Sequence, residues 1–313
     1  MPATDLEISR ASGIDLSRLP PPDVIETLDF ETILAELKAR FLDLYPEEDR
    51  TAMAAVINLE SEPIAILLQA TAYQELLLRA RINEAARQCQ LASATGSNLD
   101  QLAALFGVVR LVVDPGNPDA IPPIAPTWES DARLRERAQL AIEGMSTAGP
   151  SESYRFHALS ADGGVADASV TSPTPGLVVV TILANAGDGT PTQALLDAVA
   201  AHLNDETIRP LTDEVQVQGA TLEPYAVEAV LTLFPGPSPE VILTAAQEAV
   251  TAYVAATRRI GYDVTRSGLF AALHQSGVQN VTLTSPATDL VVPATAASHC
   301  TGITITLAGA PDV

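Results

Sequence analysis

The spacing of hydrophobic and polar residues divides the chain into a helical first part and a mixed second part. Over the first hundred residues or so, apolar side chains recur every three or four positions, which is the period of an amphipathic helix. From Gly149 onward, short apolar runs bounded by glycine, proline and aspartate alternate with further helical stretches. This change of period predicts an α+β fold, with a helical N-terminal region followed by two small related α/β modules.

Four helices are expected in the first part, each with recognisable end signals. Asp29 suits an N-cap, with Thr32 in the first turn. In chain order, the expected helices lie between Asp29 and Pro46, Glu47 and Leu59, Ser61 and Gly96, and Ser97 or Asn98 and Gly107. The third helix is about 30 residues long, roughly 45 Å at 1.5 Å per residue, which exceeds the usual length in globular proteins.

This third helix has more apolar positions than one buried stripe needs. Ile64, Leu67 and Leu68 begin a stripe at helical spacing, and Leu76–Leu78 widen it. One face can then serve the local core while another face receives a helix of a partner chain. The predicted partner interface consists of Ile64, Leu67, Leu68, Leu76, Leu77, Leu78 and Ile82.

A proline-rich segment, Val108–Thr127, follows the helical region. It holds a short apolar strand and then five prolines, which favours an extended connector. The expected domains are therefore 1–107, a helical core region; 108–127, the connector; 128–220, a central α/β module; and 221–313, a C-terminal α/β module. As a hypothesis, the connector is a jointed spacer that lets two copies of the chain adopt different domain arrangements.

The mixed part is expected to alternate helices with short strands. The expected helices are 130–144, 151–161, 190–203, 239–259 and 266–275, and the expected strands are 165–171, 177–183, 215–218, 225–234, 278–284 and 303–307.

Two stretches of the mixed part resemble each other. Phe156–Leu159 (FHAL) matches Phe270–Leu273 (FAAL), and Val165–Val179 aligns without gaps with Val278–Val292. Seven of those 15 aligned positions are identical, including the tripeptide Thr-Ser-Pro. Convergence on similar turn chemistry is the alternative explanation. The number of identities favours two related modules, each a helix followed by a two-stranded unit.

The acidic composition of the chain argues against nucleic acids and anionic membranes as partners. The formal net charge is −22, from 39 acidic and 17 basic residues, and such a balance repels nucleic-acid phosphates and anionic membranes. The first residues carry neither a basic stretch nor an apolar core of a Sec signal, and no apolar run approaches about 18 residues. We therefore expect synthesis in the cytoplasm and no nucleic-acid or membrane partner. Cys89 and Cys300 are expected to be buried thiols in a reducing compartment.

The most basic stretch of the chain contains Arg133, Arg135 and Arg137 on one predicted helix. A solvated face, or a set of ion pairs toward an acidic neighbour, is the favoured interpretation, and an anion-binding site is the alternative.

Residues 146–167 collect the side-chain types of a hydrolase. Ser151 or Ser153 with His157 provides a candidate nucleophile and base, but no GxSxG turn is present. Ser151 also suits a helix N-cap, and Glu152 suits the first turn of the same helix. The second copy of the repeat has Ala271 in place of His157. The two copies therefore share core and turn positions but not the polar side chains that a catalytic site would need. A structural interpretation is favoured, and we predict no enzyme activity.

Metal and cofactor signals are weak. The four histidines stand apart in sequence, and His299-Cys300 is the only adjacent pair of soft ligands. Asn185–Pro191 (NAGDGTP) resembles a glycine-rich loop but lacks the phosphate-binding spacing, and it is typical of a strand-to-helix turn. No cofactor and no metal site are predicted.

Five segments of the chain closely resemble the baseplate J family of contractile phage tails and R-type pyocins. They include LESEPIAILLQATAYQELLLRARINEAA at 59–86 and ATGSNLDQLAALFGV at 94–108, and the others lie at 19–41, 129–173 and 258–286. The segments occur in the family's order and run from about Leu19 to about Leu307. The peripheral barrel-like insertion of the family is reduced here to Val108–Thr127.

The resemblance implies a structural baseplate wedge subunit located in the tail particle. It implies that two copies pair with one smaller wedge protein, that six such wedges surround the hub, and that neighbouring hub and sheath proteins are contacted. Helices of the N-terminal part are expected to bundle with the wedge partner, and the C-terminal modules are expected to dimerise between wedges. The resemblance brings no catalytic residue. The alternatives are a surface or adhesive module and, less favoured, the Ser-His hydrolase.

Overall fold

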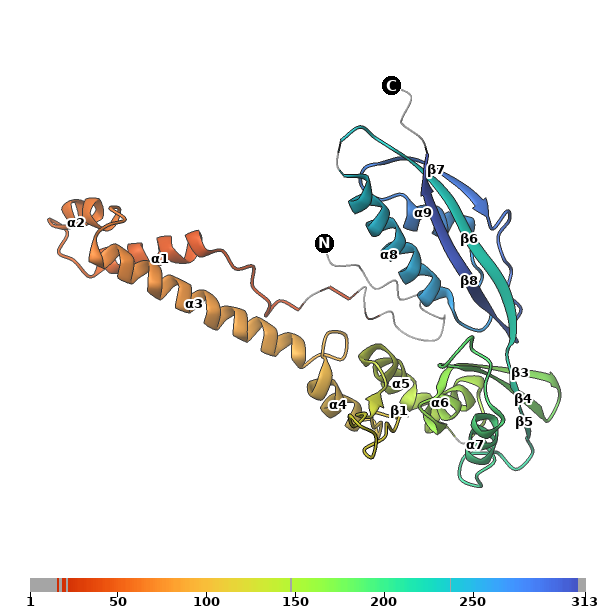
Figure 1. Cartoon of the computed structure of the whole chain (residues 1–313). Helices are drawn as coiled ribbons and strands as arrows, with labels where there is room; N and C mark the ends of the chain where they lie inside the picture. The colour runs from red at the N-terminus through yellow and green to blue at the C-terminus, as the bar shows by residue number, and fades with distance from the viewer. Residues whose placement is uncertain (1–15, 17–18, 21, 147, 237, 309–313) are drawn as a thin grey trace. The chain divides into compact units, whose positions relative to one another are not determined.

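The computed structural model of the chain describes residues 16, 19–20, 22–146, 148–236 and 238–308 (Figure 1). These residues fall into two compact units, 16–102 and 103–308. The first unit is helical, and the second contains two small three-stranded sheets with helices. The predicted α+β fold, with a helical N-terminal region followed by small α/β modules, is confirmed.

The first unit contains α1 (Phe30–Asp43), α2 (Arg50–Ile57), α3 (Pro63–Gln88) and most of α4 (Gly96–Ala104). The Asp29 carboxylate accepts a hydrogen bond from the Thr32 N–H at 2.8 Å, which confirms the predicted N-cap of α1. The predicted cap of α3 at Ser61 is wrong. Glu62 occupies that N-cap without a side-chain bond, and Pro63 opens the helix, where its missing N–H costs no intrahelical bond.

The long helix α3 ends at Gln88, earlier than the predicted end at Gly96. Beyond it, side chains bond to the local backbone: Ser93 Oγ donates to the Arg87 carbonyl at 2.7 Å, and Gln88 Oε1 accepts from the Thr95 N–H at 2.9 Å. Such local bonds compete with continued helix. Gly96 instead opens α4, with a φ of 54° in the left-handed region that glycine adopts most readily.

The core of the first unit lies where α1 and α2 pack on α3. Leu34, Ile57 and Leu68 are buried there. The segment before α1 is held along α3 by the buried Asn83. Its Nδ2 donates to the Glu26 carbonyl at 2.8 Å, and its Oδ1 accepts from the Glu26 N–H at 3.1 Å. This pair of bonds satisfies both backbone polar groups of Glu26, which lies outside any helix or strand.

The proline-rich segment is a hairpin, so the predicted extended connector is wrong. Its two arms are β1 (Val112–Asp114) and β2 (Thr127–Trp128), which pair antiparallel, with a further bridge between Asn117 and Ile124. Gly116, at a φ of 68°, makes the turn possible, and an added Cβ there would lie 2.4 Å from the Ile124 carbonyl oxygen. The prolines occupy the loop of the hairpin, where no ladder N–H is needed.

The central module of the second unit is an α/β sandwich. Its elements are α5 (Asp131–Gly144), α6 (Ser151–Ala161), β3 (Val165–Thr174), β4 (Leu177–Ala184), α7 (Gln193–Leu203) and β5 (Glu214–Gly219). In the sheet order β3-β4-β5, β3 runs antiparallel and β5 parallel to the central strand β4. Since α6 packs on β3, α7 packs on β5, and the two helices contact each other, both cover one face of the sheet.

The C-terminal module repeats this layout. Its elements are β6 (Thr221–Leu233), α8 (Pro239–Thr257), α9 (Arg266–Leu273), β7 (Val278–Ser285) and β8 (Ala296–Leu307). In the order β7-β6-β8, β7 is antiparallel and β8 parallel to the central strand β6 (Figure 1). Helix α9 packs on β7, and α8 packs on β8.

The two modules share this arrangement, and the predicted two-stranded unit after the helix is confirmed in the first copy but wrong in the second. In the first copy β3 pairs with the strand that follows it, whereas β7 pairs with β6, which precedes it in sequence. The aligned segment Leu290–Val292 is not a strand, although Leu177–Val179 begins β4. The sequence repeat therefore marks one helix–strand pair, α6–β3 and α9–β7, set into differently connected sheets.

Candidate assembly surfaces

The surface of α3 opposite the local core is apolar. Leu67, Leu77, Leu78 and Ile82 are all more than half exposed, with Leu78 at 66% and Leu77 at 51%. Leucine and isoleucine side chains scattered singly on a surface need no explanation, but a set gathered on one helix face marks a site of association. This part of the predicted partner interface is therefore available to another chain.

The remaining residues of the predicted interface serve the local core. Leu68 is buried, and Ile64 and Leu76 are half-buried and pack against the same cluster as Leu34 and Ile57. The sequence placed all seven residues on one interface because their spacing fits a single wide stripe. The packing of α1 and α2 on α3 divides them into two faces, which no local pattern specifies.

Three exposed residues of this surface, Ile66, Ala70 and Tyr73, were absent from the prediction. Ile66, Ala70, Tyr73 and Leu77 are spaced by four, three and four residues and are all exposed, so they form a stripe along the helix. A spacing that alternates three and four is that of a coiled-coil seam. This regularity was present in the sequence and was hidden by the neighbouring apolar positions. The name α3 face is used below for Ile66, Leu67, Ala70, Tyr73, Leu77, Leu78 and Ile82.

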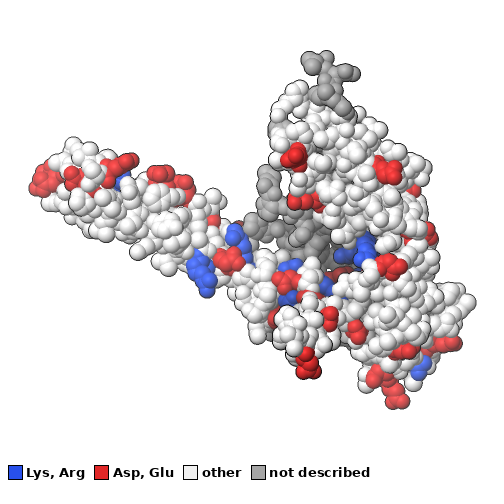
Figure 2. Space-filling model, viewed as in Figure 1, with Lys and Arg blue, Asp and Glu red and all other residues white. Residues whose placement is uncertain are grey.

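Charge is unevenly distributed over the first unit. Figure 2 shows acidic side chains gathered near α1 and α2 and a largely uncharged stretch along the middle of α3. Arg79, on the core side of α3, is paired within the unit, with its Nη2 at 2.6 Å from the Glu75 carboxylate. The α3 face is therefore suited to apolar packing, because few charges on it need to be removed from water.

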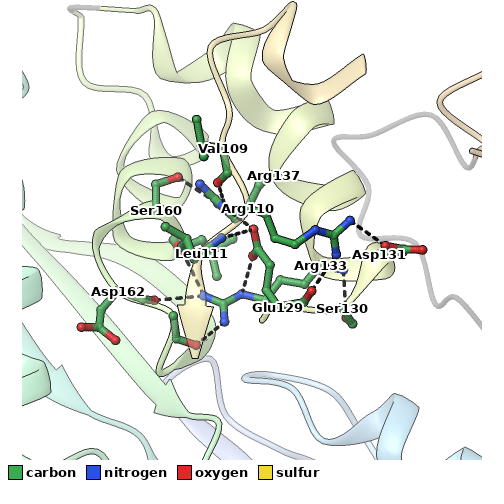
Figure 3. A network of polar contacts seen from close by, with 12 residues as sticks. Val109, Arg110, Leu111, Glu129, Ser130, Asp131, Arg133, Arg137, Ser160 and Asp162 are labelled. Carbon is green, nitrogen blue, oxygen red and sulfur yellow. Dashed lines mark hydrogen bonds and ion pairs between the residues drawn. The ribbon is translucent and has the colours of Figure 1, made fainter. Parts of the chain in front are cut away.

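A buried ionic network ties the hairpin to α5 (Figure 3). Its centre is Glu129, which is 3% exposed. One carboxylate oxygen, Oε1, contacts the Arg137 guanidinium and accepts from the Leu111 N–H at 3.1 Å, and the other, Oε2, lies 3.5 Å from Arg133 Nε. Arg137 Nη1 also donates to the Val109 carbonyl at 3.2 Å. The segment that leads into β1 is therefore fixed against the helix that follows β2.

The same network extends to the backbone on both sides. Arg110 donates to the Glu129 carbonyl and to the Asp131 carboxylate, each at 2.7 Å. Arg133 Nη2 donates to the carbonyls of Asp162 and Leu159 at 3.0 and 3.1 Å, at the end of α6. These bonds hold the hairpin, α5 and α6 together. The hypothesis that residues 108–127 form a jointed spacer is therefore not supported.

The three arginines were predicted to form a solvated face or ion pairs. Arg137 is buried and Arg133 is largely so, which makes the solvated face wrong for these two residues. Both pair instead with the buried Glu129 of the same chain, and an ion-pair surface toward an acidic neighbour stays a prediction. Burial lowers the pKa of both guanidinium groups, and the Glu129 charge opposes that shift. Arginine stays charged in either case. Glu129 itself was missed, although its spacing of four and eight residues from Arg133 and Arg137 was a usable signal.

The candidate catalytic residues are engaged in structural contacts. Helix α6 begins at Ser151 after Pro150, so the predicted side-chain cap at Ser151 is wrong. The buried Ser153 hydroxyl donates to the Ser146 carbonyl at 3.3 Å. His157 Nε2 is 3.0 Å from the Gly144 carbonyl, and its ring lies 5.6 Å from that of His202. Burial lowers the pKa of both histidines. These contacts connect α5, α6 and α7.

The thiols and the other histidines add no metal-binding group. Cys89 is exposed and Cys300 is half-buried, so the prediction of two buried thiols is wrong. Within the part of the chain that the structure describes, no three His, Cys, Asp or Glu side chains converge in a way that could hold a metal ion. Within the same part, no helix is long and apolar enough to cross a membrane.

Comparison with known proteins decides the family. Models of the Baseplate J-like N-terminal, central and C-terminal domains match residues 60–117, 146–219 and 225–306 in that order. Baseplate protein J of Escherichia phage P2 is 45% identical over 299 residues, which cover 96% of this chain and 99% of that protein. The chain belongs to the baseplate J family. Among solved structures, a chain of the anti-feeding prophage baseplate is similar to this one, with a TM-score of 0.42 and 15% sequence identity. The aligned part covers 57% of this chain and 44% of the baseplate chain.

The baseplate J assignment relates directly to the surfaces described above. The N-terminal family model covers all of α3 and α4 and continues into the hairpin after β1. The central model begins at Ser146 and ends with β5, and the C-terminal model spans nearly all of β6 through β8. The predicted domain boundaries at 107, 127 and 220 remain predictions.

Proposed function

We propose that this chain is a structural subunit of the baseplate wedge of a contractile tail, in a phage or in a phage-tail-like bacteriocin. The observation that carries the proposal is the 45% identity, over nearly the full length of both chains, to a protein named baseplate protein J. In this role the chain acts through its surfaces. Its working location is the tail particle, and its synthesis takes place in the host cytoplasm.

In the proposed wedge, two copies of the chain assemble with one smaller wedge protein. The α3 face supplies the contact, because its apolar stripe has coiled-coil spacing and lies opposite the core that α1 and α2 complete. A helix packed against this stripe would bury Tyr73 and Leu77, and a buried tyrosine is among the side chains that contribute most to binding.

The second unit has a different part in the proposal. Its two modules contact the same modules of another copy of the chain in a neighbouring wedge. Six wedges joined in this way form a ring around the hub, next to the sheath. Because the Glu129 network fixes the hairpin to α5, motion during contraction is expected at other places than residues 108–127. This replaces the hypothesis of a jointed spacer.

A hydrolase based on Ser151 or Ser153 with His157 is not favoured, because the Ser153 hydroxyl and His157 Nε2 are engaged with backbone carbonyls. An adhesive role at a cell surface gains no support from the α3 face, whose coiled-coil spacing suits a helical partner.

The test is complementation of tails that lack the chain. Wild-type chain should restore contractile particles with complete baseplates, and the Leu77→Asp variant should leave particles without them while remaining folded. The Glu143→Gln variant, altered at an exposed position of α5, serves as the control and should restore particles. Normal tails built with no copy of the chain would contradict the proposal.

A further inference from the structure

Edge strands carry unpaired backbone groups, and proteins usually protect them with charges, prolines, bulges or short length. The two three-stranded sheets of the second unit have four edges, formed by β3, β5, β7 and β8. Three of them are protected. Strand β3 contains Pro173 near its end, and β5 is only six residues long and begins with Glu214. At β7, the Arg266 side chain bonds the Leu283 carbonyl at 3.3 Å and also contacts the Pro286 carbonyl.

The remaining edge, β8, lacks such protection over its second half. Its first residues are covered, since the Gly261 N–H donates to the Ala296 carbonyl at 2.9 Å and Ile260 bridges to Ala297. Residues 301–307, with the sequence TGITITL, contain no charge and no proline. Within the described residues, backbone pairing of this stretch is to β6 alone. Uncharged, β-branched edges of this kind add strands readily.

The direction of the unpaired groups follows from the ladder. The Ala308 N–H donates to the Leu231 carbonyl of β6 at 2.9 Å. Backbone groups alternate in direction along a strand, so the N–H and C=O groups of Ile303, Ile305 and Leu307 point away from β6. On the two faces, Ile303 and Ile305 pack against the core, while Thr304 and Thr306 are exposed.

This stretch is complementary to itself about Thr304. A twofold axis perpendicular to the sheet at Thr304 places Ile303 opposite Ile305 of a second copy, and places Thr304 opposite its own equivalent. The Ile303–Ile305 pairs would exchange backbone hydrogen bonds, with both side chains on the core face. The two Thr304 residues would form a non-hydrogen-bonded pair with Cα atoms about 4.5 Å apart. Both kinds of pair are favourable cross-strand neighbours.

We propose that the open half of β8 pairs antiparallel with the β8 strand of a second copy of this chain, centred on Thr304, giving a continuous six-stranded sheet. This inference rests on the proposed function, because it identifies the surface through which copies in neighbouring wedges meet. A parallel or out-of-register pairing would place the Ile303 and Ile305 positions opposite different partners.

The test uses charge pairs at the axis. In the full-length chain carrying Leu77→Asp, which removes self-association through α3, the variants Thr304→Lys and Thr304→Glu each place like charges opposite each other. Each should weaken self-association, measured by sedimentation equilibrium, by at least about tenfold. A mixture of the two variants should recover it, because lysine then faces glutamate. Thr282→Lys, at an exposed position of β7, is the matched control and should associate like the parent.

Three outcomes overturn the inference. One is association that is unchanged by Thr304→Lys. Another is loss in both variants without recovery in the mixture, which means that a different register or a different chain occupies the edge. The third is equal weakening by Thr282→Lys. None of these outcomes contradicts the proposed wedge function. Complex formation with the smaller wedge protein depends on the α3 face, and it is measured separately with the Leu77→Asp variant alone.

Discussion

The Asp167 carboxylate joins the two modules of the second unit by accepting a hydrogen bond from the Ile260 N–H at 3.0 Å. Asp167 lies on β3, is 3% exposed, and is also 3.3 Å from the Arg155 guanidinium. Around this bond, Leu183, Ile260 and Ala297 form a small apolar cluster between the sheets. The central and C-terminal modules are thus held together by a buried charge and by apolar contact.

Replacing Asp167 with alanine should destabilise the second unit by about 3 kcal/mol, because the change removes a charged partner of the buried Arg155 and the acceptor of the Ile260 N–H. Denaturant unfolding of the full chain, followed by a signal from the second unit, measures this loss.

The control is Asp197→Asn on the exposed side of α7, where Asp197 accepts a hydrogen bond from the Gln193 side chain at 2.8 Å. Its effect should stay within about 0.5 kcal/mol. Equal unfolding free energies for Asp167→Ala and wild type would show that the bond does not join the modules.

Glu129→Gln should loosen the hairpin. The variant removes the charge that Arg133 and Arg137 share, and breaking a buried pair costs about 3–5 kcal/mol. Amide hydrogen exchange at Leu111, whose N–H donates to the Glu129 carboxylate, should become faster. The exposed Glu143→Gln on the same helix is the control. Unchanged exchange at Leu111 in Glu129→Gln would count against the network as the anchor of the hairpin.

The His157–His202 pair should make the stability of the second unit depend on pH. Burial lowers the pKa of each histidine, and the nearby Asp205 charge partly opposes this for His202. The unfolded chain therefore binds more protons than the folded chain as the pH falls through the ordinary histidine pKa of about 6.5. The two neutral histidines therefore contribute their full stabilisation above about pH 6.5. That stabilisation is lost as the pH falls from about 6.5 through the lower pKa values of the folded chain.

The measurement compares unfolding free energies at about pH 7.5 and about pH 5.5, on either side of the ordinary histidine pKa. The double variant His157→Gln with His202→Gln should reduce the difference between the two pH values, whatever its effect on absolute stability. The variant His274→Gln, at an exposed position, should keep the wild-type difference. A difference that is the same in the double variant and in wild type would assign the pH dependence to other groups.

The two faces of α3 should respond differently to substitution. Leu68→Ala should destabilise the first unit by about 2–5 kcal/mol, because Leu68 is buried in its core. Leu77→Asp should change the unfolding free energy by less than about 0.5 kcal/mol, because the Leu77 side chain is exposed. Thermal unfolding of the two variants distinguishes the faces, and a large loss in Leu77→Asp would mean that Leu77 belongs to the local core.

The local elements were largely predictable from the sequence. Asp29 is an N-cap as expected, and α6 has the predicted bounds, because capping and apolar spacing act within a few residues. The predicted strand 303–307 corresponds only to the last part of β8, which begins at Ala296. The preceding stretch, AASHCTG, has no apolar alternation, and it becomes a strand because β6 offers a parallel partner more than 70 residues away.

The candidate surfaces were predictable in part. The excess of apolar positions on α3 indicated an interface, but the division between core and surface depends on how α1 and α2 dock. The pairing of Glu129 with Arg133 could be expected from their spacing, but its bond to the Leu111 N–H could not, because the tertiary fold brings that group near. The same holds for the bond between Asp167 and the Ile260 N–H. The sequence neighbourhood of Asp167 resembles ordinary polar surface.

The central claim is that the chain works as a wedge subunit through the α3 face, and the mass of its complex tests this most directly. Co-expression with the smaller wedge protein, followed by native mass spectrometry of the purified complex, should give two copies of this chain with one copy of the partner. The same experiment with Leu77→Asp should give no complex, while Glu143→Gln should give the wild-type mass. A chain that stays monomeric beside the partner, or a complex that is indifferent to Leu77→Asp, would contradict the account.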